Sequence, residues 1–374
     1  MAETAPNAIP TVAVVGPFPP YKGGIAQHTA QLANGLSGRT HVRRLGWIDQ
    51  YPALLYGRPQ VDSSAGATAS VENLLRWWNP FTWIRAGREL RSVDLAILPW
   101  VSPVHALTFL TMMTVARSTP VLVHVHNAAP HEPIPFSAFF LRQVLKRSKG
   151  MICHGQAIAN EVAELGADLE TRVVPHAPDL DVAVTSLPPR PPIELLFAGT
   201  LRGEQGLDLL LEALVILDRP DINITIAGEV WDEAARPTNA QLTSVPGSVR
   251  THLSYVSDDH LCELLESCHA LVAPYRSASQ SGIVALATAA GRPAVVTPVG
   301  ALPEAIEDGV NGIVATRPDD ARSLAEAIDR LIVDLDSLAL GAAAAISTWD
   351  DYAVEALELA EVGDLTNPVH APMD

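Results

Sequence analysis

Short runs of apolar, β-branched residues alternate with amphipathic stretches along almost the whole chain. In the first half, the apolar runs predict strands at residues 11–16, 41–46, 94–99, 120–126, 150–155 and 172–176. The helical patterns between them cover residues 25–36, 103–116, 136–147 and 157–166. Because the strand runs are apolar throughout rather than alternating, we expect parallel strands buried on both faces.

The same rhythm restarts after four prolines at residues 185–192, which predict a stiff linker. Further strands are expected at residues 193–200, 223–228, 249–256, 269–275, 293–298 and 312–316, with helices at 207–217, 260–268, after Gly282, and at 319–332. This pattern predicts an α/β chain of two doubly wound, Rossmann-like domains, residues 1–184 and 193–346. We expect a disordered tail at 366–374.

Composition supports two globular domains and excludes some functions. The chain has 374 residues, 48% hydrophobic and 18% charged, which is too long for one ordinary core. Its net charge of −17 is uneven: residues 1–190 hold 16 Lys and Arg against 13 Asp and Glu, whereas residues 191–374 hold 9 against 29. A nucleic-acid partner is disfavoured because no large basic patch exists.

Three signals bear on the compartment. The N-terminus has an acidic residue and no apolar core, so we expect no signal peptide, and no apolar run reaches membrane-spanning length. The three cysteines form no CxxC pair, which favours reduced thiols in a cytoplasmic protein. Residues 139–150 combine phenylalanines with basic residues, as an interfacial helix would, although a sheet-covering helix is slightly favoured.

Residues 49–84 form a long, aromatic-rich connection. The segment contains six aromatic side chains: Tyr51, Tyr56, Trp77, Trp78, Phe81 and Trp83. A connection of this length is either functional or partly mobile. Packing is favoured over a hydrophobic acceptor or membrane contact.

Glycines follow the first predicted strand. Gly23 and Gly24 at the start of a helix leave backbone N–H groups that can face an anion. The pattern is not GxGxxG and lacks a suitably spaced acidic residue, so NAD is disfavoured. Taken alone, an ordinary glycine-rich turn fits equally well.

The stretch HVHNAAPHE, residues 124–132, ends the fourth predicted strand of the first half. Its histidines invite a metal site, but His124 and His126 share one strand face while His131 and Glu132 fall in a Pro-flanked loop. A hydrogen-bonding pocket wall that uses His126 and Asn127 is favoured over a metal site.

Two stretches of the second half suggest anion binding. Arg202 follows the first strand of that half, where a guanidinium can bind a phosphate with two hydrogen bonds. In SQSGIVALATAAGRP, residues 279–293, Ser281 can cap a helix and Gly282 allows close approach to the backbone. No Asp or Glu occurs between Glu266 and Glu304, so this helix start is uncharged.

The order of these motifs resembles the retaining GT-B glycosyltransferases of glycosyltransferase family 4. The resemblance rests on GGIAQHTAQLANGL, HNAAPHE, VVPHAPD, FAGTLRGEQGLDLLLEAL, APY followed by SQSG, and AAGRPAVVTPVGALPEAIEDGVNGIV. It is greatest for a subset with QSG where other members have Glu-x-Phe-Gly, and it extends to QYPALLYG and NPFTW in the aromatic segment. STWDDYAVEAL resembles the C-terminal helix of the family, which implies that a helix at about 347–365 packs back on the first domain.

The resemblance implies a GT-B fold whose two domains face each other across a cleft, and metal-independent transfer of a sugar with retention. The donor would be a UDP- or GDP-linked sugar, and the acceptor a glycan, lipid-linked or small molecule. The chemistry is assigned to His126, Arg202 and Gln280. Donor-binding residues would be Gly23, Gly24, Thr200, Gln205, Ser281, Gly282, Ile283 and Glu304, and acceptor or pocket-wall residues Asn127, His28 and Trp100. Such a protein would be cytoplasmic, with or without contact to the inner face of the membrane.

Several positions depart from the family. Gln205 stands where relatives carry a Lys for the diphosphate, and Ala278 and Leu286 stand where most carry two Glu residues. Arg276 or Arg292 could replace the missing cation, although surface placement is equally expected. These departures keep open a degenerate homologue that regulates or scaffolds an active transferase. A nucleotide-sugar epimerase or phosphorylase ranks lower.

Overall fold

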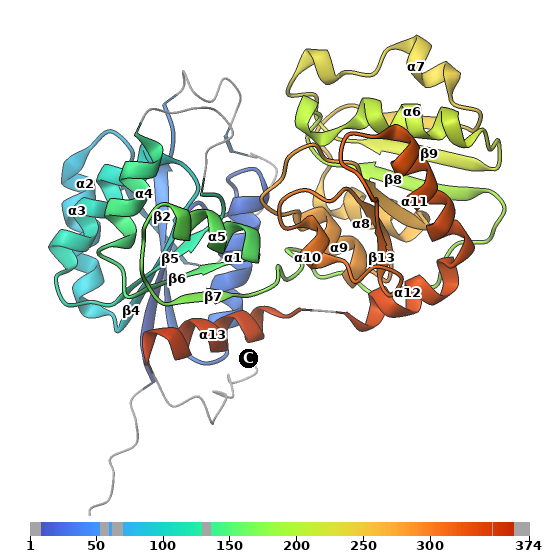
Figure 1. Ribbon diagram of the computed structural model, residues 1–374. Helices are drawn as coiled ribbons and strands as arrows, with labels where there is room; N and C mark the ends of the chain where they lie inside the picture. Colours follow the sequence, from blue (N-terminus) through green and yellow to red (C-terminus); the bar gives the residue numbers. More distant parts are fainter. Residues whose placement is uncertain (1–8, 53–59, 62–69, 129–135, 346, 363–374) are drawn as a thin grey trace, which may run out of the picture. The chain divides into compact units, whose positions relative to one another are not determined.

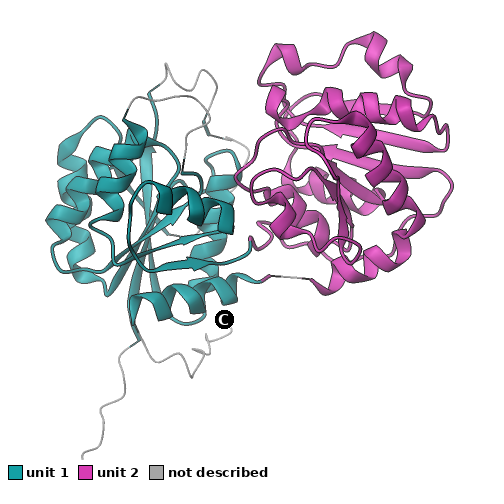
Figure 2. Cartoon of the chain, in the orientation of Figure 1, with its two compact units in different colours: residues 1–175, 348–374 teal, residues 176–347 magenta. Residues whose placement is uncertain are grey.

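The computed structural model describes residues 9–52, 60–61, 70–128, 136–345 and 347–362. Tyr56, His131, Glu132 and the predicted tail at 366–374 lie outside these ranges. The chain divides into two compact units: unit 1 comprises residues 1–175 and 348–374, and unit 2 comprises residues 176–347 (Figure 2). Each unit is an α/β domain built on one parallel sheet.

Unit 1 contains a seven-stranded sheet in the order β3-β2-β1-β4-β5-β6-β7, with helices on both faces (Figure 1). Its strands are β1 (Thr11–Val15), β2 (His41–Asp49), β3 (Val71–Arg76), β4 (Leu95–Trp100), β5 (Val121–Val125), β6 (Gly150–Cys153) and β7 (Thr171–Val173). Its helices are α1 (Gly24–Ser37), α2 (Pro80–Glu89), α3 (Ala106–Ala116), α4 (Ser137–Leu145), α5 (Gln156–Glu164) and α13 (Trp349–Ala360). The six strands predicted for this half are confirmed.

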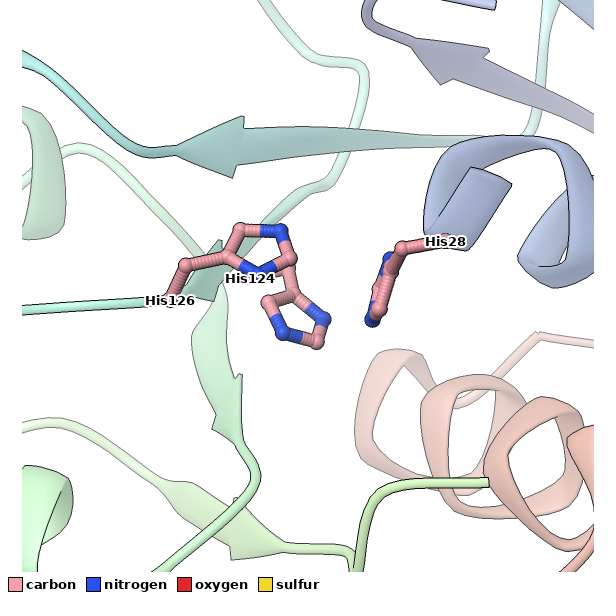
Figure 3. Close-up of side chains that lie close together, drawn as sticks. All are labelled: His28, His124 and His126. Carbon is pink, nitrogen blue, oxygen red and sulfur yellow. The ribbon is translucent and has the colours of Figure 1, made fainter. Parts of the chain in front are cut away.

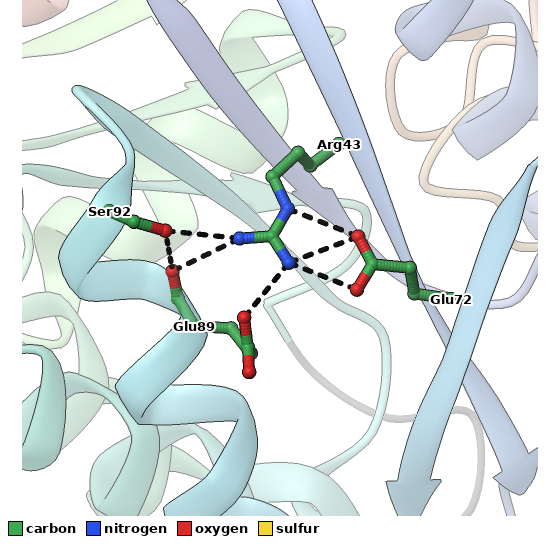
Figure 4. A network of polar contacts seen from close by, with 4 residues as sticks. All are labelled: Arg43, Glu72, Glu89 and Ser92. Carbon is green, nitrogen blue, oxygen red and sulfur yellow. Dashed lines mark hydrogen bonds and ion pairs between the residues drawn. The ribbon is translucent and has the colours of Figure 1, made fainter.

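The aromatic segment contains two elements that the apolar pattern did not predict, β3 and α2. β3 is an edge strand with several exposed positions, so it carries no continuous apolar run. A polar network holds it: Arg43 on β2 donates to the Glu72 carboxylate on β3 at 2.9 Å and to the Glu89 carboxylate at the end of α2 at 3.0 Å (Figure 4). Ion pairs on the exposed side of β3 therefore add to the burial of its Leu75 in the core.

Helix α13 packs against α1 in unit 1. Its Tyr352, Ala353 and Ala356 are buried in one cluster with Val12 and Val14 of β1. A Cβ atom on Gly35 of α1 would come within 2.9 Å of the Trp349 Cβ, so the two helices approach closely at this glycine. The last helix of the chain is thus part of the core of its first unit.

Unit 2 contains a six-stranded parallel sheet in the order β10-β9-β8-β11-β12-β13. Its strands are β8 (Ile193–Ala198), β9 (Ile222–Ala227), β10 (Val249–His252), β11 (Ala270–Ala273), β12 (Ala294–Val296) and β13 (Gly312–Val314). Its helices are α6 (Leu207–Leu217), α7 (Asn239–Ser244), α8 (Asp258–Ser267), α9 (Gly282–Ala289), α10 (Leu302–Ala305), α11 (Ala321–Val333) and α12 (Leu335–Ala344). All six strands predicted for this half are confirmed, whereas α7, α10 and α12 were not predicted.

The proline-rich segment 185–192 belongs to unit 2, which differs from the predicted free linker. The Arg292 guanidinium is fully buried and donates to the Thr185 carbonyl oxygen at 2.8 Å and to the Leu265 carbonyl oxygen at 2.9 Å. His269 also contacts the Pro188 carbonyl oxygen at 3.1 Å. These bonds attach the segment to unit 2. Arg292 is therefore a structural residue, and both the surface and the ligand role considered for it are wrong.

Candidate functional site

The turns that follow the carboxyl ends of the strands in unit 2 pack against one another. In parallel α/β sheets, this edge is where ligands bind. Gly206, with a positive φ of 69°, lies against the Pro274 carbonyl after β11, and Gly300 lies against the Ala278 carbonyl. Three turns that are far apart in sequence, those after β8, β11 and β12, thereby lie against one another.

Arg202 lies in the turn after β8. Its guanidinium carbon is 4.4 Å from the centroid of the Trp231 ring, and one guanidinium nitrogen is 3.6 Å from the Glu204 carboxylate. Stacking on an aromatic ring restricts the guanidinium without using its hydrogen-bond donors. Arg202 is partly exposed and so retains donors for an anion. Trp231, after β9, was not singled out from the sequence.

Gln205, which stands at the position of the missing Lys, folds back onto the same turn. Its amide nitrogen is 3.5 Å from the Thr200 hydroxyl, and its oxygen would lie 3.1 Å from a Cβ atom on Gly199. The buried Gln205 Oε1 has no hydrogen-bond partner among the described residues. The structure therefore brings Thr200 and Gln205 together.

The SQSG sequence leads into α9 as predicted, with Ser281 at the N-cap position. The Ser281 side chain makes no capping hydrogen bond; its hydroxyl lies 3.4 Å from that of Tyr275. The prediction that Ser281 caps the helix through its side chain is therefore wrong. Gln280 Oε1 is buried and has no hydrogen-bond partner in the described part of the chain. Ile283 is partly buried in the first turn of α9.

A carboxyl group that the sequence did not reveal lies at this helix start. Asp179 Oδ2 would be 3.2 Å from a Cβ atom on Gly282, and the His176 ring would be 3.7 Å from it. Burial, and secondarily the charge of Asp258, raise the pKa of Asp179 to about 8, while burial lowers the pKa of His176 to about 4. The start of α9 therefore remains uncharged near neutral pH although an acidic residue is present.

The residues at the positions that depart from the family pattern pack or form ion pairs within unit 2. Leu286 is buried in the core beneath α9, and Ala278 packs against the same cluster. Arg276 pairs with Asp208 at 2.7 Å and with Asp319 at 2.6 Å, and also donates to the Gly203 carbonyl oxygen. Arg276 thus anchors the turn that contains Gln205. Glu304 lies in the short helix α10 that follows β12.

In unit 1, the first glycine turn presents open backbone. Gly23 precedes α1 with a positive φ of 100°, a conformation that favours glycine. A Cβ atom on either Gly23 or Gly24 would meet nothing within 4 Å among the described residues. A ligand could therefore approach these backbone amides closely.

Four histidines gather below that turn. His28 on α1 lies with its ring centroid 4.5 Å from those of both His124 and His126, and His154 follows β6 with its centroid 5.0 Å from that of His28. All four side chains are buried. The structure thus brings together two predicted site residues, His28 and His126, with two that were not assigned a role. Nothing in the sequence indicated that His28 or His154 would join the strand histidines.

Two residues adjoin this histidine group, one on the last helix of unit 1 and one directly after His126. The His124 Nδ1 atom is hydrogen-bonded to the Tyr352 hydroxyl of α13, and burial raises the pKa of Tyr352 well above its ordinary value. Asn127, the next residue after His126, is buried, and its Oδ1 lacks a hydrogen-bond partner in the described ranges. Trp100, predicted as an acceptor or pocket-wall residue, is the last residue of β4 and is buried in the core cluster of unit 1.

The aromatic residues of the long connection divide between core and surface. Trp77 and Trp83 pack against the core, and the Trp83 indole donates to the Arg76 carbonyl oxygen at 2.7 Å. Trp78 and Phe81 are exposed, Phe81 by 80%. Packing in the core therefore accounts for Trp77 and Trp83 but not for Trp78 and Phe81.

Comparison with known proteins shows a family similarity in the second unit. Residues 192–334 match the family model described as glycosyl transferases group 1. Over 142 residues the chain is 35% identical to an uncharacterized glycosyltransferase of Methanocaldococcus jannaschii, covering 37% of this chain and 36% of the relative. Over 198 residues it is 29% identical to glycogen synthase of Mycobacterium tuberculosis, covering 51% and 47%. The matches thus span less than half the length of these two curated relatives.

The fold comparison covers nearly the whole chain. The Anabaena protein HepE, solved in complex with UDP and glucose, aligns with a TM-score of 0.69 and 16% identity, covering 94% of this chain and 100% of its own. Identity at this level shows the fold alone, and that fold is GT-B, as predicted. Residues 192–334 of this chain are therefore similar to the group 1 glycosyltransferases, and the whole chain shares their fold.

Proposed function

We propose that the protein transfers a sugar from a nucleotide-diphosphate donor to an acceptor. The observation that carries this proposal is that the family match at residues 192–334 coincides with the carboxyl edge where Arg202, Gln280 and the start of α9 lie. HepE, the fold relative, was solved with UDP and glucose. We infer a nucleotide-linked hexose as donor, with UDP the first candidate.

In this proposal, unit 2 binds the donor. Negative charge develops on the diphosphate as the sugar leaves, and hydrogen-bond donors fixed beforehand stabilise that charge. Arg202, held over Trp231, supplies guanidinium donors, and the first amides of α9 supply others. Gln280 and Ser281 would hydrogen-bond the hydroxyl groups of the sugar. Their neutrality avoids repulsion of the diphosphate.

Unit 1 would bind the acceptor, with His126 as a catalytic residue. The backbone amides at Gly23 and Gly24 face open space and would bind an anionic group. Asn127 lies beside His126 and has a buried amide oxygen that a ligand hydroxyl could satisfy. We propose retention of configuration, with phosphate binding by Arg202 and amides rather than by a metal.

A peripheral membrane contact is the second part of the proposal. Phe136 and Phe139 at the start of α4 are 75% and 55% exposed, and Trp78 and Phe81 are exposed at the start of α2. Exposed aromatic groups at helix starts, with basic residues such as Arg142 on the same helix, suit a lipid-linked acceptor at an anionic surface. No helix in the described part of the chain is long and apolar enough to cross a bilayer.

A donor survey tests the proposal. The purified protein is incubated with UDP-, GDP- and ADP-sugars, and both binding and slow hydrolysis of each donor are measured. We expect one nucleotide series to bind with micromolar affinity and to be hydrolysed. Binding without any turnover, with or without added acceptor extracts, would instead indicate the regulatory homologue. Failure to bind any donor would refute the transferase assignment.

A further inference from the structure

We propose that unit 1 binds one divalent transition-metal ion, for which Zn²⁺ is best suited, through the imidazoles of His28, His124 and His126. One ring nitrogen from each of these residues can be chosen so that the three lie within 4.8 Å of one another. Figure 3 shows the ring of His28 on α1 facing the stacked rings of His124, on β5, and His126, which directly follows β5. Three imidazoles on two rigid elements form a typical ligand set for zinc.

A small cavity lies among the three rings. Its volume is about 10 Å³, and besides the histidines it is lined mainly by aliphatic side chains such as Val14, Leu32 and Ile97. A space of this size holds one water-sized particle. In such an apolar enclosure the imidazole nitrogens are the natural contacts for an ion.

Contacts outside the cavity fix the orientation of the rings. The His124 Nδ1 atom is bonded to the Tyr352 hydroxyl. His28 Nε2 lies 2.7 Å from His154 Nε2, and His154 Nδ1 donates to the Val174 carbonyl oxygen at 2.8 Å. Metal-binding histidines commonly bond a fixed partner through their second nitrogen, which sets the ring plane and raises the ligand's basicity. The histidine group has this arrangement at two of its members.

The nitrogen ligands determine which metal ion the site prefers. Among the described residues that line the cavity none is Asp or Glu, so Mg²⁺ and Ca²⁺, which prefer oxygen ligands, are disfavoured. Zn–N bonds of about 2.0–2.1 Å place the nitrogens about 3.4 Å apart, so binding draws the three rings closer together than the 4.8 Å within which their nitrogens lie. The cavity has room for the ion, and the ligands that line it are the three imidazoles.

Metal uptake by the whole protein is the first test. Chelator-treated protein is titrated with Zn²⁺ against a chromophoric chelator, and with Co²⁺ as a spectroscopic probe. We expect about one equivalent of tightly bound Zn²⁺, and intense visible Co²⁺ bands typical of tetrahedral or five-coordinate nitrogen ligation. Uptake of less than about a tenth of an equivalent by the folded wild-type protein would overturn the proposal, whatever the variants do.

Matched variants locate the bound ion. His28→Gln and His124→Gln should each weaken Zn²⁺ binding at least about tenfold, the effect expected when one ligand is lost. His260→Gln is the control, because His252 and His260 form a partly exposed pair in unit 2 that could bind zinc adventitiously. Circular dichroism checks the fold of each variant, and loss of binding only in His260→Gln would overturn the assignment. Extended X-ray absorption of the zinc-loaded wild-type protein, which requires no variant to fold, should show about three imidazole nitrogens in the first shell.

A consequence for activity rests on the proposed function. If His126 takes part in the reaction, zinc loading should suppress donor turnover, and a chelator should restore it. This result is separable from the binding test: zinc bound at the three histidines, together with no donor turnover by the chelator-treated protein, would support the metal site and refute the transferase. Donor turnover by a protein that takes up no zinc would support the transferase and refute the metal site.

Discussion

Asp179 Oδ2 lies 3.2 Å from the position that a Cβ atom on Gly282 would occupy, at the first turn of α9. Burial raises the pKa of this carboxyl group to about 8, whereas it is about 3.8 in an unfolded chain. The folded protein therefore retains a proton that the unfolded chain releases above pH 4, and stability falls as the pH rises from about 4 to about 8. His176, with its pKa lowered from 6.5 to about 4, opposes this trend only below pH 6.5.

The Asp179→Asn variant should remove this dependence. Between pH 6.5 and 8 the wild-type protein should lose stability steadily, whereas the variant should change little. Urea denaturation at several pH values measures the difference. Equal slopes for the two proteins would show that Asp179 is ionised in the folded state or not buried as described.

Arg202 should be required for donor turnover. We expect Arg202→Ala to lower kcat/KM for the nucleotide sugar by about 10- to 100-fold, because one charge-assisted contact to phosphate is lost. Arg202→Lys should recover only part of this activity, since an ammonium can neither stack on Trp231 nor form paired hydrogen bonds in the same way. Arg317→Ala is the control, because Arg317 is highly exposed and pairs with the nearby Asp320. Wild-type kinetics in Arg202→Ala would remove Arg202 from the site.

Gln280 tests the neutrality of the α9 start. Gln280→Ala should raise KM for the donor several-fold because a hydrogen bond to the sugar is lost. Gln280→Glu restores a carboxylate near the place where most relatives carry one, and we expect it to weaken donor binding further through repulsion of the diphosphate. Isothermal titration with the nucleotide sugar measures both. Tighter binding by Gln280→Glu would mean that the missing Glu residues are a loss rather than an alternative way to bind the donor.

Gly35 should tolerate no side chain. A Cβ atom there would overlap the Trp349 backbone, where α1 meets α13, so Gly35→Ala should destabilise unit 1 by about 1–3 kcal/mol. Gly38→Ala is a matched control three residues away: its φ is −68°, and the nearest atom to the new Cβ lies at 3.6 Å. Thermal unfolding of both variants tests the packing. Similar melting temperatures would contradict the close approach of the helices.

The sequence predicted the strands and helices better than it predicted which side chains of the candidate site lie together. Twelve of the thirteen strands in the described part of the chain overlap segments that the sequence predicted as strands, and the exception, β3, is an edge strand with several exposed positions. The predicted site residues Arg202, Gln205 and Thr200 do lie together because they belong to one turn. Their spacing in the sequence was sufficient to predict this.

Contacts between distant segments could not be predicted. His28 and His154 are 126 residues apart, and His124 and Tyr352 are 228 residues apart, so no local pattern links them. Trp100 follows the end of the predicted strand 94–99, but the structure includes it in β4 and buries it in the core. The contact between Asp179 and Gly282 likewise joins distant segments within unit 2. Hydrophobic periodicity does not describe contacts of this kind.

The membership of α13 in unit 1 has a consequence for synthesis of the protein on the ribosome. Unit 2 is continuous, residues 176–347, and its core clusters draw only on those residues, so it can fold as soon as they have emerged. Unit 1 begins first but receives Tyr352, Ala353 and Ala356 last. Until then, one apolar face of the unit 1 sheet stays uncovered, and the hydrogen bond between His124 and Tyr352 cannot form. The N-terminal half of the chain therefore completes its folding after the C-terminal half, and a stop codon just before residue 348 would leave a finished unit 2 attached to an unfinished unit 1.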